Sequence, residues 1–256
     1  MELGLKGKVA LVTGGSRGIG RAVVETLAQE GCDVLVVSRN ALADDGLMRS
    51  AERTGQRVVP CAADLSTVDG VDAAVEYLKR EFGRLDILVK NAGSATRGDF
   101  LKLTEADWKE GYALKFFGYV RMTRAAWPLL KASQGTLINI VGVSAYTPDA
   151  DYTIAATSNA ALLAFTKCMA ARGVEDKVRV NAVNPGQIET DRLAQVLENM
   201  GLPEAEARAQ LLKRLDMKRF GKPEDISRMV AFLASPHADY VQGAMFNVDG
   251  GRTRSW

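Results

Sequence analysis

The sequence predicts an α/β fold, a doubly wound parallel sheet flanked by helices, and two observations carry this prediction. Short apolar runs alternate with longer amphipathic segments along the whole chain. Strands separated by helices of this length join as parallel βαβ crossovers, which form a twisted sheet covered on both faces. The 256 residues suit one such domain, and no repeat, low-complexity tract or linker divides residues 1–256.

The first predicted unit contains a glycine-rich turn around which we expect the rest of the chain to be organised. Residues 9–12 are a short apolar run typical of a buried parallel strand, and residues 18–30 have the spacing of an amphipathic helix. Between them the chain offers bare backbone N–H groups and the positive end of a helix dipole, which together favour a pyrophosphate. The residues expected to contact it are Gly14, Ser16, Arg17, Gly18, Ile19 and Gly20.

The later elements follow the same alternation in order along the chain. Short apolar runs predict strands at residues 33–37, 58–62, 87–89, 136–141, 178–183 and 244–248. The segments between them have helical length and spacing, and they predict helices at residues 42–54, 68–82, 105–131, 152–171, 190–215 and 223–233.

The residues after the second strand predict which dinucleotide is bound. Ser38, Arg39 and Asn40 follow that strand, and the carboxyl ends of parallel strands form the ligand edge of the sheet. An acidic residue at this point would bind the ribose hydroxyls of NAD, whereas an arginine suits the extra phosphate of NADP. Arg17 could reach the same phosphate from the glycine turn. We therefore expect NADP(H) rather than NAD(H).

Three further segments complete the predicted cofactor site. Asp64, before Leu65, can accept a hydrogen bond from an adenine amino group, or it can instead cap the helix at residues 68–82. Asn91-Ala92-Gly93 form a turn of small residues against which a flat cofactor can lie. Asn184-Pro185-Gly186 follow a later strand and should flank the nicotinamide end.

Composition excludes several other classes of protein. A net charge of +2 gives no reason to expect a nucleic acid or an acidic membrane as partner. No apolar run approaches the roughly 20 residues of a membrane span, and the first residues lack the apolar region of a signal peptide.

The cysteines and the single histidine also bear on the class of protein. Cys32, Cys61 and Cys168 are far apart in the sequence and are interpreted as buried thiols, so we expect a reducing, cytoplasmic location. The only histidine, His237, lies in a predicted surface turn, which argues against a histidine-based triad or metal site.

Together these motifs resemble the classical short-chain dehydrogenase/reductase family over nearly the whole chain. The resemblance implies a Rossmann-type fold, hydride transfer between a nicotinamide and a small carbonyl or alcohol, and a homotetramer or homodimer. It also implies that residues 187–219 cover a substrate that the sequence does not identify. The matching motifs are Thr13-Gly14-x-x-x-Gly18-x-Gly20, Asp64-Leu65, Asn91-Ala92-Gly93, Asn184-Pro185-Gly186, residues 219–226 and Val248-Asp249-Gly250-Gly251.

The catalytic positions of that family hold other residues here. In the family a tyrosine is the general acid/base, a lysine four residues later lowers the tyrosine pKa, a serine holds the substrate oxygen, and an asparagine anchors a water chain. In the register of this sequence the tyrosine position is Ala155, the lysine Asn159, the serine Gly142 and the asparagine Lys115. The resemblance therefore implies a divergent member that lacks the usual tetrad.

Three interpretations of this site remain open at the level of sequence. A rewired oxidoreductase would use Lys115 from the opposite wall, with hydroxyls from Tyr152, one helical turn before Ala155, and from Ser144, which an extended chain would place beside Gly142. A second interpretation is an inactive NADP-binding scaffold or sensor. A third is a lyase or isomerase with Asp149 or Asp151 as base.

Overall fold

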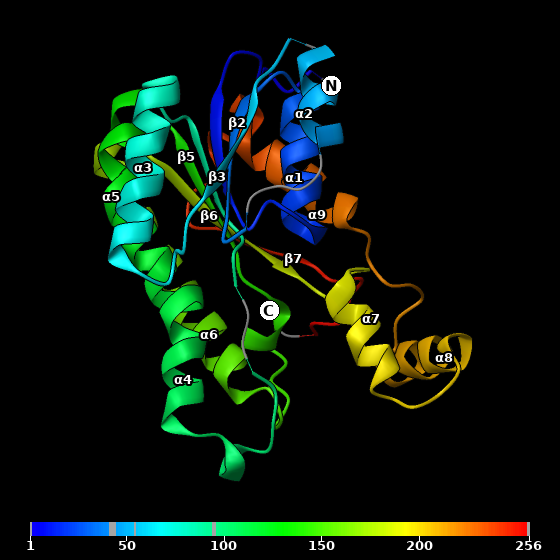
Figure 1. Cartoon of the computed structure of the whole chain (residues 1–256). Helices are drawn as coiled ribbons and strands as arrows, with labels where there is room; N and C mark the ends of the chain where they lie inside the picture. The colour runs from blue at the N-terminus through cyan, green and yellow to red at the C-terminus, as the bar shows by residue number, and fades with distance from the viewer. Residues whose placement is uncertain (1, 41–44, 54, 94–95, 255–256) are drawn as a thin grey trace.

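The computed structural model describes residues 2–40, 45–53, 55–93 and 96–254. All seven strands pair in parallel, in the order β3-β2-β1-β4-β5-β6-β7, which confirms the predicted sheet (Figure 1). Every predicted strand is present within one or two residues of its expected ends. The strands are β1 (Val9–Thr13), β2 (Asp33–Ser38), β3 (Val58–Ala62), β4 (Ile87–Lys90), β5 (Thr136–Ile140), β6 (Arg179–Pro185) and β7 (Met245–Val248).

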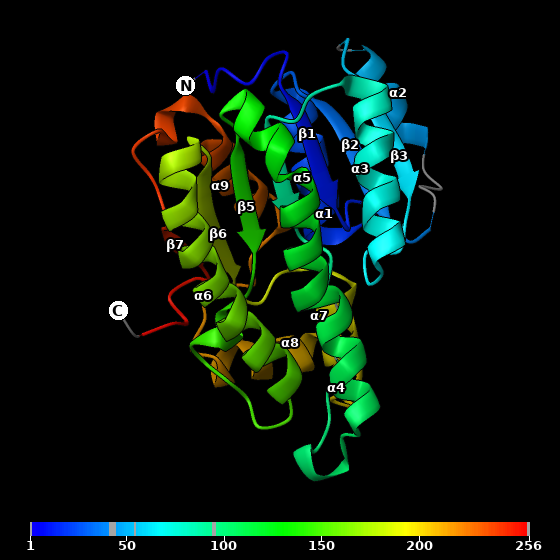
Figure 2. The same cartoon turned by 90° about the vertical axis from the view of Figure 1, so that its left-hand side faces the viewer.

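Helices cover both faces of the sheet, and each face has its own apolar core. One face carries α1 (Gly18–Gln29), α2 (Asp45–Arg53) and α9 (Pro223–Ala234), and the other carries α3 (Val68–Phe82), α5 (Tyr119–Ser133) and α6 (Thr153–Asp176) (Figures 1 and 2). Alternate residues of β1 point to the two cores: Val12 packs on the α1 side and Leu11 on the α3 side. Burial on both faces explains why the strands appear in the sequence as unbroken apolar runs.

Three helices lie beyond the carboxyl ends of the strands. They are α4 (Glu105–Tyr112), α7 (Asp191–Glu198) and α8 (Glu204–Arg214), and Figure 2 shows them at the end of the sheet to which the strand arrows point. Shorter turns occur at Phe100–Lys102, Val143–Ala145 and Pro236–Ala238. All loops expected to bind ligands therefore open at one end of the domain.

The direction of winding reverses between β1 and β4. Thr13, the last residue of β1, pairs with Val37 of β2 on one side and with Lys90 of β4 on the other. After β1 the chain continues into α1, which covers one face of the sheet. After β4 it continues toward α5, which covers the opposite face, so the loops that follow β1 and β4 run in different directions. Such a switch point is where open α/β sheets bind ligands.

Two predicted helices are interrupted in the structure, and a third is longer than expected. The helix expected at residues 105–131 is interrupted by a π-helical turn, Ala113–Gly118, between α4 and α5. The segment at residues 190–215 forms two helices, because residues 199–203 include Gly201 in the left-handed region and Pro203. Of the helix expected at residues 42–54, positions 42–44 and 54 lie outside the described residues.

The third difference is the length of α6, which continues past residue 171 to Asp176. Gly173 lies within this last part of the helix, where the Val178 carbonyl oxygen leaves no room for a Cβ, and α6 closes at Lys177 with φ 56°. Within the described residues α6 is also the one helix long and apolar enough to cross a membrane, with mean hydropathy 1.2. It packs against β6 and half of that apolar window is buried, so it serves as a core helix.

The prediction that all three cysteines are buried is wrong for one of them. Cys32 and Cys61 are buried, whereas Cys168 is exposed. On α6 the sheet-facing positions near it are Thr166 and Ala170, which places Cys168 on the outer face of the helix. His237 lies in the predicted surface turn, where its Nε2 is 2.8 Å from the Glu2 carbonyl oxygen.

A buried carboxylate joins the last turn of α6 to α5. The Asp176 side chain is 1% exposed and accepts hydrogen bonds from Trp127 Nε1 at 2.9 Å, Lys131 Nζ at 2.6 Å and Arg172 Nε at 2.7 Å. The hydrogen bonds from Lys131, Arg172 and Trp127 hold the pKa of Asp176 well below its ordinary value. A carboxylate with a depressed pKa stabilises the fold above its unfolded-state pKa, and this contribution is lost as the pH falls.

We predict that Asp176→Asn lowers the melting temperature at pH 7, because the uncharged amide loses two ion pairs and the charged hydrogen bond from Trp127. The difference from wild type should shrink as the pH falls below about 4, where the Asp176 carboxyl of the unfolded chain takes up a proton while the native carboxylate stays ionised. Thermal unfolding followed by circular dichroism from pH 3 to 8 measures both effects. A difference that stays constant across this range would contradict the assignment.

Candidate active site

The turn after β1 is packed too tightly for side chains at its glycines. A Cβ atom on Gly14, whose φ is +66°, would stand 2.9 Å from the Ala92 Cα, and one on Gly20 would overlap the Gly14 carbonyl oxygen. Gly18 adopts φ +54° where α1 begins. These positions therefore require glycine, as the sequence predicted.

The amino end of α1 is open to an anion. Its N-cap residue, Arg17, makes no side-chain capping hydrogen bond, and the first turn of α1 holds no acidic residue. The free N–H groups and the helix dipole therefore face the turn without a competing carboxylate. Together with the bare backbone of the glycines, this arrangement fits a dinucleotide diphosphate.

Asn91 joins the loop after β4 to the glycine turn. Its side-chain amide donates to the Thr13 carbonyl at 3.3 Å and to the Gly14 carbonyl at 3.1 Å. In return the Thr13 hydroxyl accepts from the backbone N–H groups of Asn91 at 2.9 Å and Ala92 at 3.1 Å. These hydrogen bonds hold Asn91 and Ala92 against the end of β1, and the two residues form the floor of the candidate cofactor site.

The carboxyl ends of β2 and β3 place the predicted adenosine-side residues together. Arg39 and Asn40 are exposed, and the Ser38 hydroxyl donates to the Asn40 carbonyl at 2.6 Å. Asp64 Oδ1 accepts from the backbone N–H and the hydroxyl of Ser66, at 2.9 and 2.7 Å. These hydrogen bonds, and then the positive charge of Arg39, lower the pKa of Asp64.

The alternative role of Asp64 as a helix cap is wrong. The N-cap of α3 is Thr67, whose hydroxyl accepts from the Gly70 N–H at 3.1 Å. Leu65, the other half of the predicted motif, is buried and packs in the core on the α3 side. Asp64 therefore stays available at the strand end.

Other predicted cofactor residues lie around the same end of the sheet. Arg17 is exposed and pairs with Asp191 of α7 at 3.1 Å. Ile19 packs against the core under α1, and Ser16 is half-buried in the turn. Pro185 is the buried last residue of β6, and the Gly186 N–H donates to the Val248 carbonyl at 3.1 Å.

Lys115 lies in the π-helical turn between α4 and α5 and is 8% exposed. Its Nζ donates to the Val141 carbonyl at 3.3 Å and would stand 3.6 Å from a Cβ on Gly93. Burial, and then the positive charge of Arg192, lower the pKa of Lys115 to about 7. A buried lysine with a neutral-range pKa at a strand end can donate or accept a proton at physiological pH.

Asn159 approaches the same end of β5 from α6. Its amide nitrogen donates to the Ser144 hydroxyl at 2.7 Å and lies 3.0 Å from where a Cβ on Gly142 would stand. Lys115 contacts Val141 and Asn159 contacts the neighbouring Gly142, so the two side chains meet at consecutive residues. Ala155, one turn earlier on α6, is fully buried.

The expectation of an extended chain at Ser144 is wrong. Val143–Ala145 forms a 3₁₀ turn that begins after Gly142, whose φ is +139°. The turn tightens because the Ala145 and Tyr146 N–H groups bond back to the Gly142 and Val143 carbonyls. Ser144 nevertheless remains beside the site through its hydrogen bond with Asn159.

Tyr152 is the N-cap residue of α6 and contacts two arginines. The Arg97 guanidinium lies 4.2 Å from the centre of its ring, and the Tyr152 hydroxyl accepts from Arg192 Nη1 at 3.2 Å. Arg192 also donates from Nη2 to the Gly93 carbonyl at 3.3 Å. Arg192 therefore bridges α7, α6 and the loop after β4.

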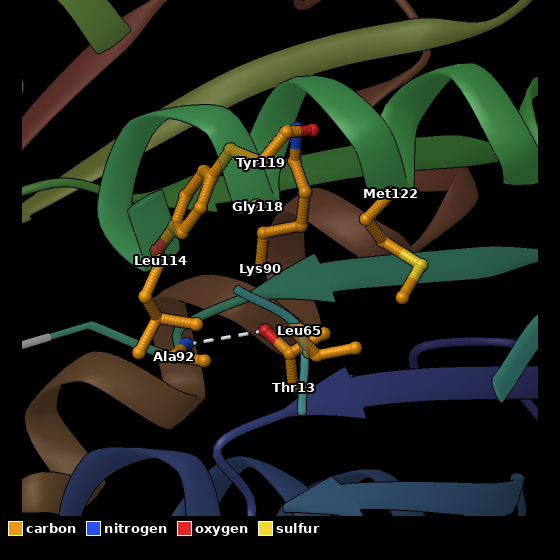
Figure 3. Close-up of a pocket in the computed structure, with 8 residues that line it drawn as sticks. All are labelled: Thr13, Leu65, Lys90, Ala92, Leu114, Gly118, Tyr119 and Met122. Atoms are coloured by element: carbon orange, nitrogen blue, oxygen red, sulfur yellow. Dashed lines mark hydrogen bonds between the residues drawn. The ribbon is translucent and has the colours of Figure 1, made fainter. Parts of the chain in front are cut away.

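A second buried lysine lies behind the floor of the site. Lys90 Nζ donates to the Tyr119 carbonyl at 3.0 Å and to the Thr123 hydroxyl, and burial lowers the pKa of Lys90 well below its ordinary value. It borders a cavity of about 10 Å³, enough for one water, together with Thr13 and Ala92 (Figure 3). Lys90 therefore supports the loop that follows β4 from the interior of the domain.

Sequence reasoning missed Arg192, Arg97 and Lys90. A lysine at the end of an apolar strand, directly before Asn91, was a visible signal for Lys90. Arg192 and Arg97 had no comparable signal, because their role depends on how α7 and the loop after β4 pack around Tyr152.

Known proteins match this fold and these motifs over nearly the full length. The family model described as enoyl-(acyl carrier protein) reductase matches residues 14–253. The 3-oxoacyl-[acyl-carrier-protein] reductase FabG of Thermotoga maritima is 34% identical over 96% of this chain and 98% of its own length. The 2-dehydro-3-deoxy-D-gluconate 5-dehydrogenase of Escherichia coli is 32% identical over 96% of each chain.

A solved structure agrees equally well. L-Sorbose reductase from Gluconobacter frateurii, complexed with NADPH and L-sorbose, superposes with a TM-score of 0.93 at 34% identity, covering 100% of both chains. The chain therefore belongs to the classical short-chain dehydrogenase/reductase family of oxidoreductases.

We predict that Gly20→Ala costs about 1–3 kcal/mol of stability, because its methyl group would overlap the Gly14 carbonyl and must displace backbone. The matched control is Gly98→Ala, whose Cβ would meet only Leu103 Cδ2 at 3.5 Å. Chemical denaturation of the three proteins measures the difference. Equal stability of both variants would show that the turn is not as closely packed as described.

Proposed function

We propose that this protein is an NADP(H)-dependent oxidoreductase that reduces a small carbonyl compound, or oxidises the matching alcohol, with Lys115 as the proton donor and acceptor. The observation that carries this proposal is the buried Lys115 ammonium between Gly93 and Val141, at the strand ends beside the dinucleotide turn. It supplies an acid/base group where the family resemblance implies that the usual tyrosine is replaced by Ala155.

The proposed chemistry divides between cofactor and protein. Bound NADPH supplies a hydride to the carbonyl carbon, and the protein supplies the proton. Lys115 Nζ donates that proton to the carbonyl oxygen, becomes a neutral amine, and regains a proton from solvent. In the oxidation direction the neutral amine accepts the proton of the alcohol. A pKa of about 7 suits both directions.

Two hydroxyls can hold the substrate oxygen. Ser144 already accepts a hydrogen bond from Asn159, so its own O–H is free to donate. The Tyr152 hydroxyl likewise accepts from Arg192 and can donate its proton. We assign both residues to positioning of the substrate and Lys115 to the proton transfer.

The non-redox alternative has no support in the geometry. Asp149 and Asp151 are exposed and paired with arginines, Asp151 with Arg97 at 2.9 Å and Asp149 with Arg97 and Arg252 at 3.8 and 3.9 Å. The inactive scaffold is an outcome of the turnover experiment below.

NADP(H) is proposed over NAD(H) on the position of Arg39. It is exposed directly after β2, where no carboxylate replaces it, and it can form a charged hydrogen bond with a ribose phosphate. The solved relative from Gluconobacter frateurii is named as a complex with NADPH. A homotetramer or homodimer remains a prediction, testable by analytical ultracentrifugation.

The proposed role of Lys115 predicts a pH profile. Reduction requires the ammonium form, so kcat/KM for a carbonyl should fall as the pH rises through about 7, while alcohol oxidation should rise over the same range. If the proton donor were instead a tyrosine with an ordinary pKa, the fall in kcat/KM would occur at about pH 10. NADPH oxidation across a panel of aldehydes, ketones and oxo acids, from pH 5 to 10, measures it.

Substitution of Lys115 separates its chemistry from its charge. Lys115→Met should lower kcat by roughly 10²–10⁴, and Lys115→Arg should do the same despite its positive charge, since arginine does not release its proton. NADPH binding, measured by fluorescence titration, should survive in both variants. Unchanged turnover would refute the role of Lys115, and tight NADPH binding without turnover of any carbonyl in the wild type would favour the scaffold.

The cofactor assignment makes a separate prediction. Arg39→Ala should weaken NADPH binding by roughly 10- to 100-fold through loss of a charged hydrogen bond, with little effect on NADH. Arg124→Ala, which removes an exposed arginine on α5, is the matched control. Equal loss of affinity for both dinucleotides, or no loss for either, would contradict the assignment.

A further inference from the structure

Arg192 is oriented toward the candidate site although it belongs to a helix at its outer edge. It is the second residue of α7, and its guanidinium donates to the Tyr152 hydroxyl at 3.2 Å and to the Gly93 carbonyl at 3.3 Å. Both partners are neutral. The side chain therefore spans the site from the covering helix to its floor while its charge has no counter-ion there.

The neighbouring arginines are paired differently. Arg97 binds Asp151 at 2.9 Å, Arg252 binds Asp149 at 3.9 Å, and Arg17 binds Asp191 at 3.1 Å. In the described part of the chain, no ion pair includes Arg192 or Lys115. The nearby carboxylates are thus already engaged by other cations.

Arg192 and Lys115 also converge on one residue. Arg192 Nη2 contacts the Gly93 carbonyl, and Lys115 Nζ would lie 3.6 Å from a Cβ on the same glycine. The Lys115 side chain lies against the bare Cα of Gly93, where a Cβ would meet its Cγ at 3.4 Å, while Arg192 contacts the carbonyl of the same residue. Two unpaired cations at close range repel, and an anion between them relieves that repulsion.

We propose that Arg192 and Lys115 form a recognition site for an oxo acid, in which Arg192 binds the carboxylate and Lys115 faces the adjacent carbonyl oxygen. A planar guanidinium fits a carboxylate with two parallel hydrogen bonds. Because Arg192 and Lys115 both approach Gly93, the carboxylate and the reacting carbonyl should be close neighbours in the substrate. This inference rests on the proposed function and specifies its substrate class.

A cofactor phosphate is the other possible anion, and the geometry disfavours it. The diphosphate is expected at the glycine turn and the start of α1, whereas Arg192 turns toward Tyr152 at the start of α6. The α7 residue that reaches the glycine turn is instead Asp191, which pairs with Arg17 of that turn at 3.1 Å. The experiments below distinguish an oxo acid from a cofactor phosphate as the anion that Arg192 binds.

Binding without turnover is the first test. Oxalate, a dianion of two adjoining carboxylates, is titrated calorimetrically into the wild-type protein saturated with NADPH. Arg192→Gln should weaken oxalate binding by roughly 10- to 100-fold, and Arg192→Lys by less, since lysine keeps the charge but not the fork. Arg214→Gln, at an exposed arginine on α8, should leave it unchanged.

The Kd of NADPH for the same variants shows whether Arg192 binds an oxo acid or a cofactor phosphate. An Arg192→Gln variant that loses NADPH affinity and keeps oxalate affinity would assign Arg192 to a cofactor phosphate and overturn the proposal. Retention of both affinities would overturn it as well. Loss of oxalate binding with NADPH binding preserved supports it.

Turnover of matched substrates tests the inference against the proposed function. Two-oxo acids of three to six carbons are compared with their neutral methyl esters, and wild type should favour the acids by roughly 10- to 100-fold in kcat/KM. Equal turnover of acids and esters would overturn the oxo-acid site and leave the reductase intact. Arg192-dependent oxalate binding with no turnover of any carbonyl would overturn the reductase and retain the anion site.

Discussion

The loops that follow β1 and β4 meet at backbone distance, and this contact constrains the rest of the site. Thr13 and Asn91 exchange hydrogen bonds across the two strand ends, and the Cα of Ala92 lies 2.9 Å from where a Cβ on Gly14 would stand. This contact holds the glycine turn against the loop after β4, and Arg192 of α7 bonds to Gly93 of the same loop.

A buried lysine at this point is energetically demanding. An ammonium group loses several kcal/mol of hydration on burial, and Lys115 has one carbonyl partner and a neighbouring positive charge. With its pKa at about 7, the residue can shed its charge near neutral pH rather than strain the fold. The π-helical turn that carries Lys115 is a local departure from regular geometry of the kind often found at functional sites.

The sheet could be predicted closely from the sequence because buried parallel strands have an unmistakable apolar pattern. The structural roles of the glycines and of Asn91 could be predicted equally well, since they depend on backbone packing within one supersecondary unit. The interruption before Tyr119 was not predicted, because the segments on both sides of it are themselves helical and no proline marks the change. Arg192 was missed for a different reason: its direction is set by tertiary packing of α7, which no local pattern encodes.

Gly142 restricts how this site can change during evolution. Its φ of +139° is a conformation that L side chains rarely adopt, and Asn159 Nδ2 occupies the space a serine Cβ would approach to 3.0 Å. A mutation that introduces serine here is therefore penalised until Asn159 has also changed and the backbone has relaxed. Positions 142 and 159 are therefore sterically coupled, so a side chain at 142 requires both a relaxed backbone and a different neighbour at 159.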